Sequence, residues 1–475
     1  MSTTINSNYD LPDAVDALSK FDKNAIRLFL KKSPRPNLDH IPVSKGMPLV
    51  GHMYWFTNDT LKWLEDQYKQ FGPVFKLKAM NREVVMLLGP DANRLLLQNE
   101  DKVFSNFLAY GPTIKNLLDD NVLSLDFAHH KHTRKTLQAA FKQPAVEGHI
   151  ELMNPMIQNG LNNWPLNKTI KSTQYIRKLL LDTGASVFLG LDMGKDAERM
   201  NQAFVDLVGG GAAYFRFEKI PFSPYAKALR ARKVMEEFIY RSINERRKTG
   251  TEGRDIFSQL CNARDEQGNY LTDREVCNQI IFVLFAAHDT TSSALSSTFY
   301  ALATNKAWQQ ELREEMFSLH KENLEFTDFD KLEKTGWTLQ EALRMYPPAP
   351  FFPRYALKEF EFAGYQIPAN TPLMGNAPFT HYMPEYWSHP YTFDPLRFSP
   401  ERAEDKKDFF QYVPFGGGAH KCLGLHFSQV QGKMFLFHFL KNYAIDKNPK
   451  LKAFNYRNFP LTFPTDGLPL TFTRI

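Results

Sequence analysis

The chain has 475 residues, 43% of them hydrophobic, and carries a formal net charge of +6. This length and apolar content allow a large packed core, and no Ser/Gly linker or low-complexity block divides the chain, so we expect one domain over residues 34–475 behind an extension over residues 1–33. The mild charge does not predict nucleic-acid binding, which usually needs a dense basic patch and a recognisable motif.

The N-terminal segment lacks the apolar core of a signal peptide, because Asp13, Asp16 and Lys20 interrupt it. The longest apolar run, Ile280 to Ala287, is much shorter than the roughly 20 residues that span a bilayer. We therefore expect a cytoplasmic protein without a transmembrane anchor. Residues Phe21 to Lys32 have an apolar face followed by two lysines, so they are a candidate contact for a membrane surface, although a short helix packed on its own core is the preferred interpretation.

Proline, glycine and apolar periodicity predict a mainly α fold with a small β-rich lobe. An irregular proline-rich segment over residues 34–51 precedes a helix over 60–70, and two short apolar strands follow over 74–77 and 84–88. From residue 92 to about 346 the pattern is mostly helical, and after residue 354 it becomes irregular again. The loops expected within the helical part fall at residues 108–126, 209–224 and 249–255.

Polar residues follow the apolar run of the expected central helix, at Asp289 and Thr290. A buried polar group without a partner costs about 1–3 kcal/mol, so these residues indicate a function. A helix bend caused by the threonine bonding back to a carbonyl is the alternative. Adjacent helix positions point about 100° apart, so we expect His288 to face a neighbouring helix and not to act as a proton shuttle.

A Glu341/Arg344 pair lies at i, i+3 spacing near the end of another expected helix. Such pairs contribute only about 0.2–0.5 kcal/mol when exposed and are common, so the pair alone predicts no function. Its context is more specific. Tyr346, Pro347 and Pro348 end that helix, and an arginine-containing segment over residues 393–398 follows.

The loop over residues 415–424 reads Phe-Gly-Gly-Gly-Ala-His-Lys-Cys-Leu-Gly. Three consecutive glycines permit positive φ and a close backbone approach to a flat ligand. Helical spacing resumes after Cys422, so its sulfur lies near a helix N-terminus, where a thiolate is stabilised. An inert buried cysteine is the alternative. With Cys261 and Cys277 there are only three cysteines, too few for a disulfide framework and typical of a reducing compartment.

This loop resembles the signature F-G-x-G-x-H-x-C-x-G of the cytochromes P450, the haem-thiolate monooxygenases. Three other segments are similar to motifs of the same family. The A-G-x-D/E-T-T motif corresponds to residues 286–291, with Ala287 in place of glycine. The E-x-x-R motif corresponds to residues 341–344, and the P-E-R-F motif to residues 395–398, with Leu396 in place of glutamate.

The resemblance implies that Cys422 is the axial ligand of a haem b iron and that Phe415 packs beside the sulfur. Gly416 is a fixed position of this haem-binding signature, Gly424 leaves room for the macrocycle, and His420 is similar to a residue that binds a propionate. Thr290 would hydrogen-bond the dioxygen over the iron, and Asp289 would help relay protons from solvent.

Further residues are implied in haem retention. Glu341, Arg344 and Arg397 would form a buried network behind the haem, and Arg354 would reach a propionate. His130 and Arg134 resemble a further propionate-binding pair, but His129 and His132 leave the register of that match open.

The resemblance also places a substrate pocket above the iron, with an aromatic and apolar lining that favours a lipophilic molecule such as a fatty acid, terpenoid or sterol. The candidate lining residues are Tyr110, Ile114, Phe285, Ala286, Phe351 and Phe352.

The chain is thus identified as a soluble, bacterial-type member of the family that activates O2 and hydroxylates or epoxidises its substrate. It contains no G-x-G-x-x-G after a strand and no further cysteine cluster. We therefore expect a monomer that receives electrons from a separate ferredoxin or flavodoxin-like donor with its NAD(P)H reductase. Lys421, Lys406 and Lys407 are candidate contacts for an acidic donor, with a merely solvated basic loop as the alternative.

Two alternatives remain at this point. A peroxygenase that uses hydrogen peroxide directly would share the haem and the fold, but such members usually lack the acid and alcohol pair. A non-catalytic haem sensor would show no turnover, and the chain carries no recognisable output domain.

Overall fold

The structure is a computed structural model that describes residues 33–475 except 48–50, 80–81, 139–140, 142, 191–196, 212–217, 219, 251–252, 254, 265–267 and 450–452. The expected surface helix at Phe21 to Lys32 lies outside the described residues. The chain divides into two compact units, each built from separate stretches of sequence. The first unit comprises Met1–Lys135, Phe351–Thr380 and Asp408–Lys421, and the second comprises Thr136–Pro350, His381–Lys407 and Cys422–Ile475.

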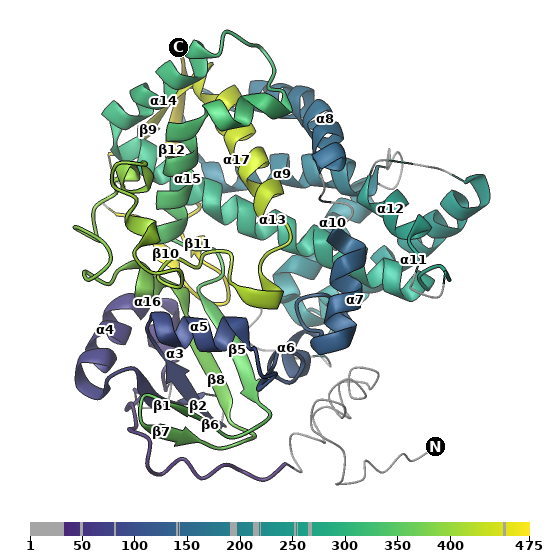
Figure 1. Ribbon diagram of the computed structural model, residues 1–475. Coiled ribbons are helices and arrows are strands. Elements are labelled where there is room, and N and C mark those ends of the chain that lie inside the picture. The colour runs from purple at the N-terminus through teal and green to yellow at the C-terminus, as the bar shows by residue number, and fades with distance from the viewer. Residues whose placement is uncertain are drawn as a thin grey trace. The chain divides into compact units, whose positions relative to one another are not determined.

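The first unit contains a five-stranded mixed sheet in the order β1-β2-β8-β5-β3 (Figure 1). Only the β2 to β8 pairing is parallel. A cluster of fully buried side chains that includes Val85, Leu87 and Leu373 packs this sheet against α5 through Leu96. The strands are β1 (Val74–Ala79), β2 (Arg82–Leu87), β3 (Phe104–Ser105), β5 (Phe351–Ala356) and β8 (Pro372–Asn376), with a separate hairpin of β6 (Phe360–Phe362) and β7 (Tyr365–Ile367).

Short helices accompany this sheet. They are α3 (Met53–Thr57), α4 (Thr60–Phe71), α5 (Pro90–Gln98), α6 (Phe107–Ile114), most of α7 (Phe127–Gln138) and the 3₁₀ turn η6 (Gly418–His420). Helix α16 (Ala377–His381) follows β8.

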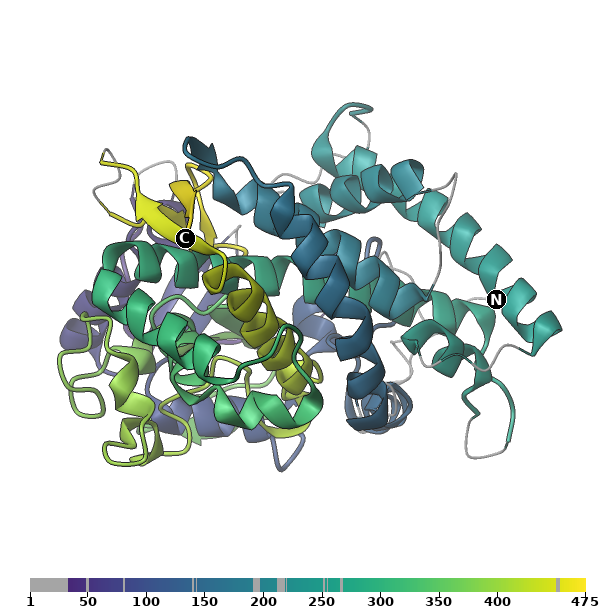
Figure 2. The ribbon, with the colours of Figure 1, turned by 90° about the horizontal axis from the view of Figure 1, so that it is seen from above.

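The second unit is dominated by long helices. These are α8 (Gln143–Asn162), α9 (Ser172–Leu189), α10 (Ala197–Gly211), α11 (Pro224–Thr249), α12 (Ile256–Asn262), α13 (Asp273–Thr304), α14 (Lys306–Ser318), α15 (Glu333–Met345) and α17 (Leu425–Leu440). Helix α13 contacts α9, α15 and α17 (Figure 1), and α8 runs beside α17 (Figure 2).

Small sheets and 3₁₀ turns complete this unit. The strands β4 (Thr169–Lys171), β12 (Pro469–Arg474) and β9 (Tyr443–Lys447) form one sheet, and β10 (Tyr456–Arg457) pairs with β11 (Phe463–Pro464). The turns are η3 (Phe326–Lys331), η4 (Pro395–Phe398) and η5 (Glu404–Lys406).

An aromatic cluster joins the helices of the second unit to its C-terminal sheet. The Trp164 ring lies with its centroid 6.4 Å from that of Phe299 on α13, 5.8 Å from Phe439 on α17 and 5.4 Å from Phe472 on β12. Aromatic pairs at these separations contribute about 0.5–1.5 kcal/mol beyond the area that they bury. The cluster therefore holds α13 and α17 together through a shared core.

Helix α13 starts at a capping box in which Thr272 accepts from the N–H of Glu275, and the Glu275 carboxylate accepts from the N–H of Thr272. These bonds satisfy backbone donors that no helical carbonyl can reach. The helix ends at Thr304, with Asn305 as its C-cap, and its middle is fully helical at Asp289 and Thr290.

The expected fold class, mainly α with small β-rich parts, is confirmed. One expected loop, residues 108–126, is wrong in its first part because α6 occupies Phe107 to Ile114. The Asp126 carboxylate accepts bonds from the N–H groups of Asn106 and Phe107 at the start of that helix. The N-terminal donors of α6 are thus satisfied from a distant point of the sequence, which local patterns do not reveal.

The expectation of an irregular region after residue 354 is wrong in part, because the end of β5 and the strands β6, β7 and β8 lie there. Within the described residues, none of the helices is both long enough and apolar enough to span a bilayer.

Candidate functional site

Two of the three consecutive glycines have a left-handed backbone, with φ of 67° at Gly416 and 59° at Gly418, whereas Gly417 is extended. A Cβ on Gly418 would lie 2.0 Å from the carbonyl oxygen of Leu97, the penultimate residue of α5. No side chain fits in that space. In addition to the conformational freedom expected from the sequence, the loop needs glycine at this position in order to approach α5.

Cys422 is the one exposed cysteine of the chain, and only Leu423 and Gly424 separate it from the start of α17. All three cysteines lie among the described residues and none forms a disulfide. Burial is the main cause that raises the pKa of the Cys261 thiol to about 11 and that of Cys277 to about 12. A thiolate is therefore unfavourable at both buried positions, while Cys422 has the helix N-terminus and the access that a metal-binding thiolate needs.

The first unit brings His130, on α7, against His420, on η6. Their rings stack with centroids 3.8 Å apart. Burial, and then the charge of Arg134, lowers the pKa of His130 to about 4. Burial, with the nearby His130, Arg354 and Arg134, lowers the pKa of His420 well below its ordinary value. Both rings are therefore neutral at pH 7, beside two guanidinium groups.

This cluster has the character of an anion site. Nε2 of His130 is buried and has no hydrogen-bond partner among the described residues. An orphaned nitrogen of this kind is costly unless it finds a partner, and an anionic acceptor would satisfy it beside two arginines. Of the three crowded histidines, only His130 is buried. The residues present thus fit the carboxylates of a haem.

Arg354 lies at the centre of a set of contacts that the sequence did not indicate. Its guanidinium donates to the carbonyl oxygens of Leu96 and Pro353 and bonds the phenol of Tyr110. Tyr110, expected to line a substrate pocket, is thus engaged with Arg354 in the first unit. Asp126 also lies near Arg354, and burial raises the pKa of its carboxyl to about 6, although the Ser105 hydroxyl and two backbone N–H groups favour the charged form.

The second unit places Asp289 and Thr290 on α13. The Asp289 carboxylate is buried and lies 2.7 Å from the Arg177 guanidinium and 3.0 Å from the His288 ring. Burial by itself raises the pKa of the Asp289 carboxyl, but the hydrogen bonds and charges of His288 and Arg177 outweigh it and hold this pKa below its ordinary value. Asp289 is thus a carboxylate held by two cationic or polar partners.

The Thr290 hydroxyl donates to the carbonyl of Ala286 at 2.7 Å, as the helix-bend alternative expects. Thr298 makes the same bond to Ala294, so this bond does not set Thr290 apart. A hydroxyl that donates still has lone pairs with which to accept, so Thr290 remains able to bind a further donor. Its partly exposed side chain leaves it accessible, unlike the buried Thr298.

The other residues proposed for a pocket occupy different surroundings. In the second unit, the Phe285 ring packs against Gly211 of α10, and Ala286 is partly exposed. In the first unit, Phe351 stacks edge-on with Phe56, with ring centroids 5.0 Å apart, and Phe352 covers Gly375. Ile114, the last residue of α6, is half-buried. Their role in lining a pocket stays a prediction.

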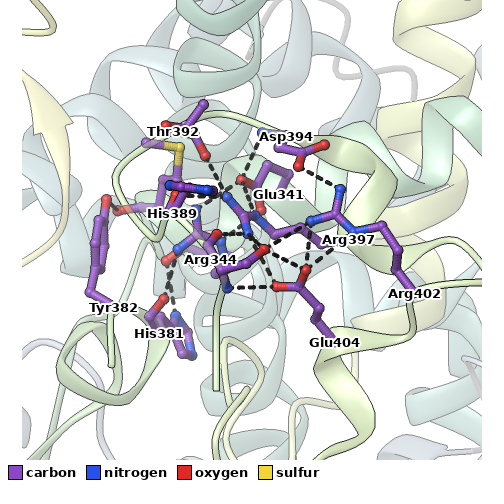
Figure 3. Close-up of polar contacts among 12 residues, drawn as sticks. Glu341, Arg344, His381, Tyr382, His389, Thr392, Asp394, Arg397, Arg402 and Glu404 are labelled. Atoms are coloured by element: carbon purple, nitrogen blue, oxygen red, sulfur yellow. Dashed lines mark hydrogen bonds and ion pairs between the residues drawn. The ribbon is translucent and has the colours of Figure 1, made fainter. Parts of the chain in front are cut away.

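The Glu341 carboxylate joins two arginines at a fully buried point of the second unit (Figure 3). Arg344 donates to both of its oxygens, at 2.7 and 2.8 Å, and Arg397 donates to Oε1 at 3.2 Å. The N–H of Asp394 bonds the same Oε1 at 3.0 Å. Arg344 also donates to the carbonyl of His381, so the network connects α15 with the last residue of α16.

Arg397 also bonds Glu404, at 3.1 Å, a residue that the sequence did not indicate. Leu396 stands where the family motif has its glutamate and is largely exposed. Glu404 therefore supplies a second carboxylate to Arg397 and also binds Arg402 at 2.5 Å (Figure 3). Its distance along the chain from residue 397 matches no motif, so only the folded chain reveals it.

Comparison with known proteins places these features in a family context. The family model described as Cytochrome P450 matches residues 41–468. The chain is 31% identical to a putative cytochrome P450 136 of Mycobacterium tuberculosis over 92% of this chain and 89% of the relative. It is 27% identical to a taxane 10-beta-hydroxylase of Taxus cuspidata, over 89% and 88% of the two chains. The structure of retinoic acid bound cyanobacterial CYP120A1 superposes with a TM-score of 0.82 at 26% identity, over 92% of this chain and 99% of that one.

The Glu341 network generates a stability prediction. Replacing Glu341 with glutamine leaves two buried guanidinium groups without their shared negative charge, so we expect a loss of about 3–5 kcal/mol in the free energy of unfolding. Urea denaturation followed by circular dichroism measures the loss. The exposed Glu385→Gln variant is the matched control and should change stability by about 0.5 kcal/mol or less. Equal stability of the two variants would contradict the importance of the network.

Proposed function

Because this chain belongs to the cytochrome P450 family of haem-thiolate monooxygenases, we propose that it hydroxylates or epoxidises a lipophilic, terpenoid-like molecule with one atom of O2. The observation that carries this proposal is the placement of Cys422, the one exposed cysteine, directly before α17 at the cysteine position of the family signature. The acid and alcohol pair on α13 supports it.

We assign Cys422 as the iron ligand. A thiolate there is stabilised by the free N–H groups at the start of α17. Gly424 carries no side chain, and the position that a Cβ would take there lies 4.0 Å from the sulfur, so glycine leaves this flank of the ligand open. Phe415 and Gly416 are proposed to lie beside the haem.

The cluster of His130, Arg134, Arg354 and His420 is proposed to bind the propionates of haem b. Arg354 and Arg134 supply charge, and the orphaned Nε2 of His130 supplies a donor when that nitrogen carries the proton. Tyr110 is proposed to orient Arg354 through its phenol. Burial is the main cause that lowers the pKa of His420, and two carboxylates beside these groups would offset the positive charge that adds to this lowering.

When bound, the haem supplies the activation of dioxygen and the transfer of one oxygen atom to the substrate. The protein supplies protons. The Thr290 hydroxyl is partly exposed on α13 and can accept one hydrogen bond while it donates another. Asp289 is the preceding residue of the helix, and its carboxyl has a lowered pKa, so it is ionised. It is proposed to pass protons to Thr290.

The relatives favour a terpenoid-like substrate over a fatty acid. Their printed names include hydroxylases of taxanes, an abscisic acid 8'-hydroxylase of Arabidopsis thaliana and a beta-amyrin 6-beta-monooxygenase of Solanum lycopersicum. The solved relative holds retinoic acid. These molecules are isoprenoids with an extended or fused apolar skeleton, and Phe285 and Ala286 would contribute apolar contact surface.

The electrons are proposed to come from a separate ferredoxin or flavodoxin-like protein with its NAD(P)H reductase. Lys421 is exposed immediately before Cys422, and positive charge there favours an acidic donor. The protein is proposed to act as a monomer in the cytoplasm. The peroxygenase alternative is disfavoured by Asp289 and Thr290, because direct use of peroxide does not need them. The non-catalytic haem sensor is disfavoured by the same pair, since a sensor does not need to deliver protons.

The ligand assignment predicts a spectroscopic change. The ferrous-carbonyl form of the wild type should show the red-shifted Soret band of thiolate ligation, and Cys422→Ala should lose it. Cys261→Ala removes a buried thiol of the second unit and should keep the band. A normal band in Cys422→Ala would remove Cys422 from the iron.

The role of Thr290 predicts uncoupling. In Thr290→Ala, reducing equivalents should leave as hydrogen peroxide in place of product, because the proton-delivering hydroxyl is gone. Peroxide and product are measured per NADPH consumed. Thr298→Ala removes a hydroxyl with the same back bond to α13 and should stay coupled. Full coupling in Thr290→Ala would contradict the assignment and favour the helix-bend interpretation.

The substrate class is tested by binding spectra. Diterpenoids, triterpenoids and retinoids should shift the haem from low to high spin at lower concentration than fatty acids of similar carbon number. Turnover with NADPH and redox proteins, compared with peroxide alone, then separates the monooxygenase from the peroxygenase. Tighter binding of fatty acids would reject the terpenoid proposal.

A further inference from the structure

Asp126 takes part in two helices of the first unit at once. Its carboxylate accepts hydrogen bonds at the start of α6, where Oδ1 lies 2.8 Å from the N–H nitrogen of Asn106 and Oδ2 lies 3.2 Å from that of Phe107. Oδ2 also accepts from the hydroxyl of Ser105. The backbone carbonyl of Asp126 accepts from the N–H of His130 at 2.9 Å, which is the first helical bond of α7. The side chain therefore caps α6 while the backbone begins α7.

The donors at the start of α6 depend on this carboxylate. Ser105, Asn106 and Phe107 are buried, so water cannot replace an acceptor that they lose. The first N–H groups of a helix have no helical carbonyl to bond, and each buried donor left unsatisfied costs about 1–3 kcal/mol. Asn106 is the N-cap residue, but its side chain makes no capping bond and donates to the carbonyl of Leu123. The start of α6 is thus held by Asp126.

Each of the two helices carries one part of the cluster that is proposed to bind the propionates. Tyr110 lies in the first turn of α6, and its phenol bonds Arg354. On α7, the ring of His130 stacks on that of His420, with centroids 3.8 Å apart. Both contacts lie about one helical turn from the bonds that Asp126 makes. A shift of its carboxylate would therefore move α6 relative to α7 and separate the two parts of the cluster.

The other end of α6 is held differently. Lys115, the C-cap residue, pairs with the carboxylates of Asp119 and Asp120, at 3.2 Å each. These partners follow Lys115 within five residues, so the ion pairs hold this end of the helix to its own loop. Asp119 is thus a partly buried carboxylate that contacts the same helix without joining it to α7, which makes it a matched control for Asp126.

We propose that Asp126 is a positioning residue for haem retention, which rests on the proposed propionate-binding role of the cluster. By capping α6 and beginning α7, it holds Tyr110 on Arg354 and His130 on His420 at the same time. The carboxylates of the haem then meet one preformed site, so binding costs little ordering of side chains. Asp126 acts through these residues and not by contact with the haem.

The capping contact is tested by hydrogen exchange of the ferric holoenzyme. Asp126→Asn replaces one acceptor oxygen with an NH2 group, so at least one of the three bonds at the start of α6 is lost. The proteins are compared at pH 8, above the pKa of about 6 to which burial raises this carboxyl. The backbone amides of residues 106–108 should exchange several-fold faster, while those of α17 in the second unit should not change. Unchanged exchange at residues 106–108 would overturn the proposal.

Haem retention is measured by transfer of haem to excess apomyoglobin. Asp126→Asn should release haem several-fold faster than the wild type, and Ser105→Ala, which removes one of the three bonds, should give a smaller increase. Asp119→Asn removes a carboxylate at the other end of α6 and should release haem at the wild-type rate. Equal rates in Asp126→Asn and Asp119→Asn would overturn the proposal. If Asp126→Asn cannot be purified with haem, the same comparison is made between Ser105→Ala and Asp119→Asn.

A double-mutant cycle separates positioning from a general loss of stability. In Tyr110→Phe the phenol no longer holds Arg354, so adding Asp126→Asn should raise the rate of haem release by a smaller factor than it does in the wild type. A merely destabilised fold would give the same factor in both backgrounds, because independent effects on the free energy add. Equal factors would contradict the positioning role.

The proposed function of the cluster is tested separately by Arg354→Gln. A wild-type rate of haem release from Arg354→Gln would reject the propionate-binding role and, with it, the role of Asp126. Faster release from Arg354→Gln together with a wild-type rate from Asp126→Asn would reject only the role of Asp126.

Discussion

The fully buried Glu341 carboxylate is the constraint on which much of the second unit depends. It balances the charges of Arg344 and Arg397 and also accepts the backbone N–H of Asp394. Residues 381–407 contain only short helical turns, so regular secondary structure cannot hold them. Buried charges tolerate few geometries, because each lost bond leaves an ion without water or partner. The network therefore determines where this segment lies against α15.

Burial and neighbouring charge also determine the charge states of the groups proposed for haem binding and for proton delivery, with different results in the two units. In the first unit, burial beside Arg134 and Arg354 keeps His130 and His420 neutral, so the cluster offers donors and positive charge to an anion. In the second unit, Asp289 stays ionised despite its burial because a guanidinium and an imidazole adjoin it. Desolvation opposes charge in both places, and the neighbouring groups decide the outcome.

The motifs predicted the main residues of the candidate site, because Cys422, Thr290 and Arg344 belong to short patterns whose spacing encodes their local geometry. They did not predict the partners. Glu404 reaches Arg397 without any motif, and Asp126 satisfies the start of α6 from a distant position. Such contacts form when loops bring together residues that are distant in sequence, and local periodicity does not predict them.

By itself, the sequence determined the family, the order of most helices, the cysteine before α17 and the acid and alcohol on α13. These follow from covalent neighbours and from helical spacing, which act over a few residues. Only the tertiary structure decided the charge states and the partners: which histidine of the crowded group is buried, what holds Asp289, and where the nitrogens of His288 point. Burial and hydrogen bonding are properties of the assembled chain, because both require atoms from segments that are distant in sequence.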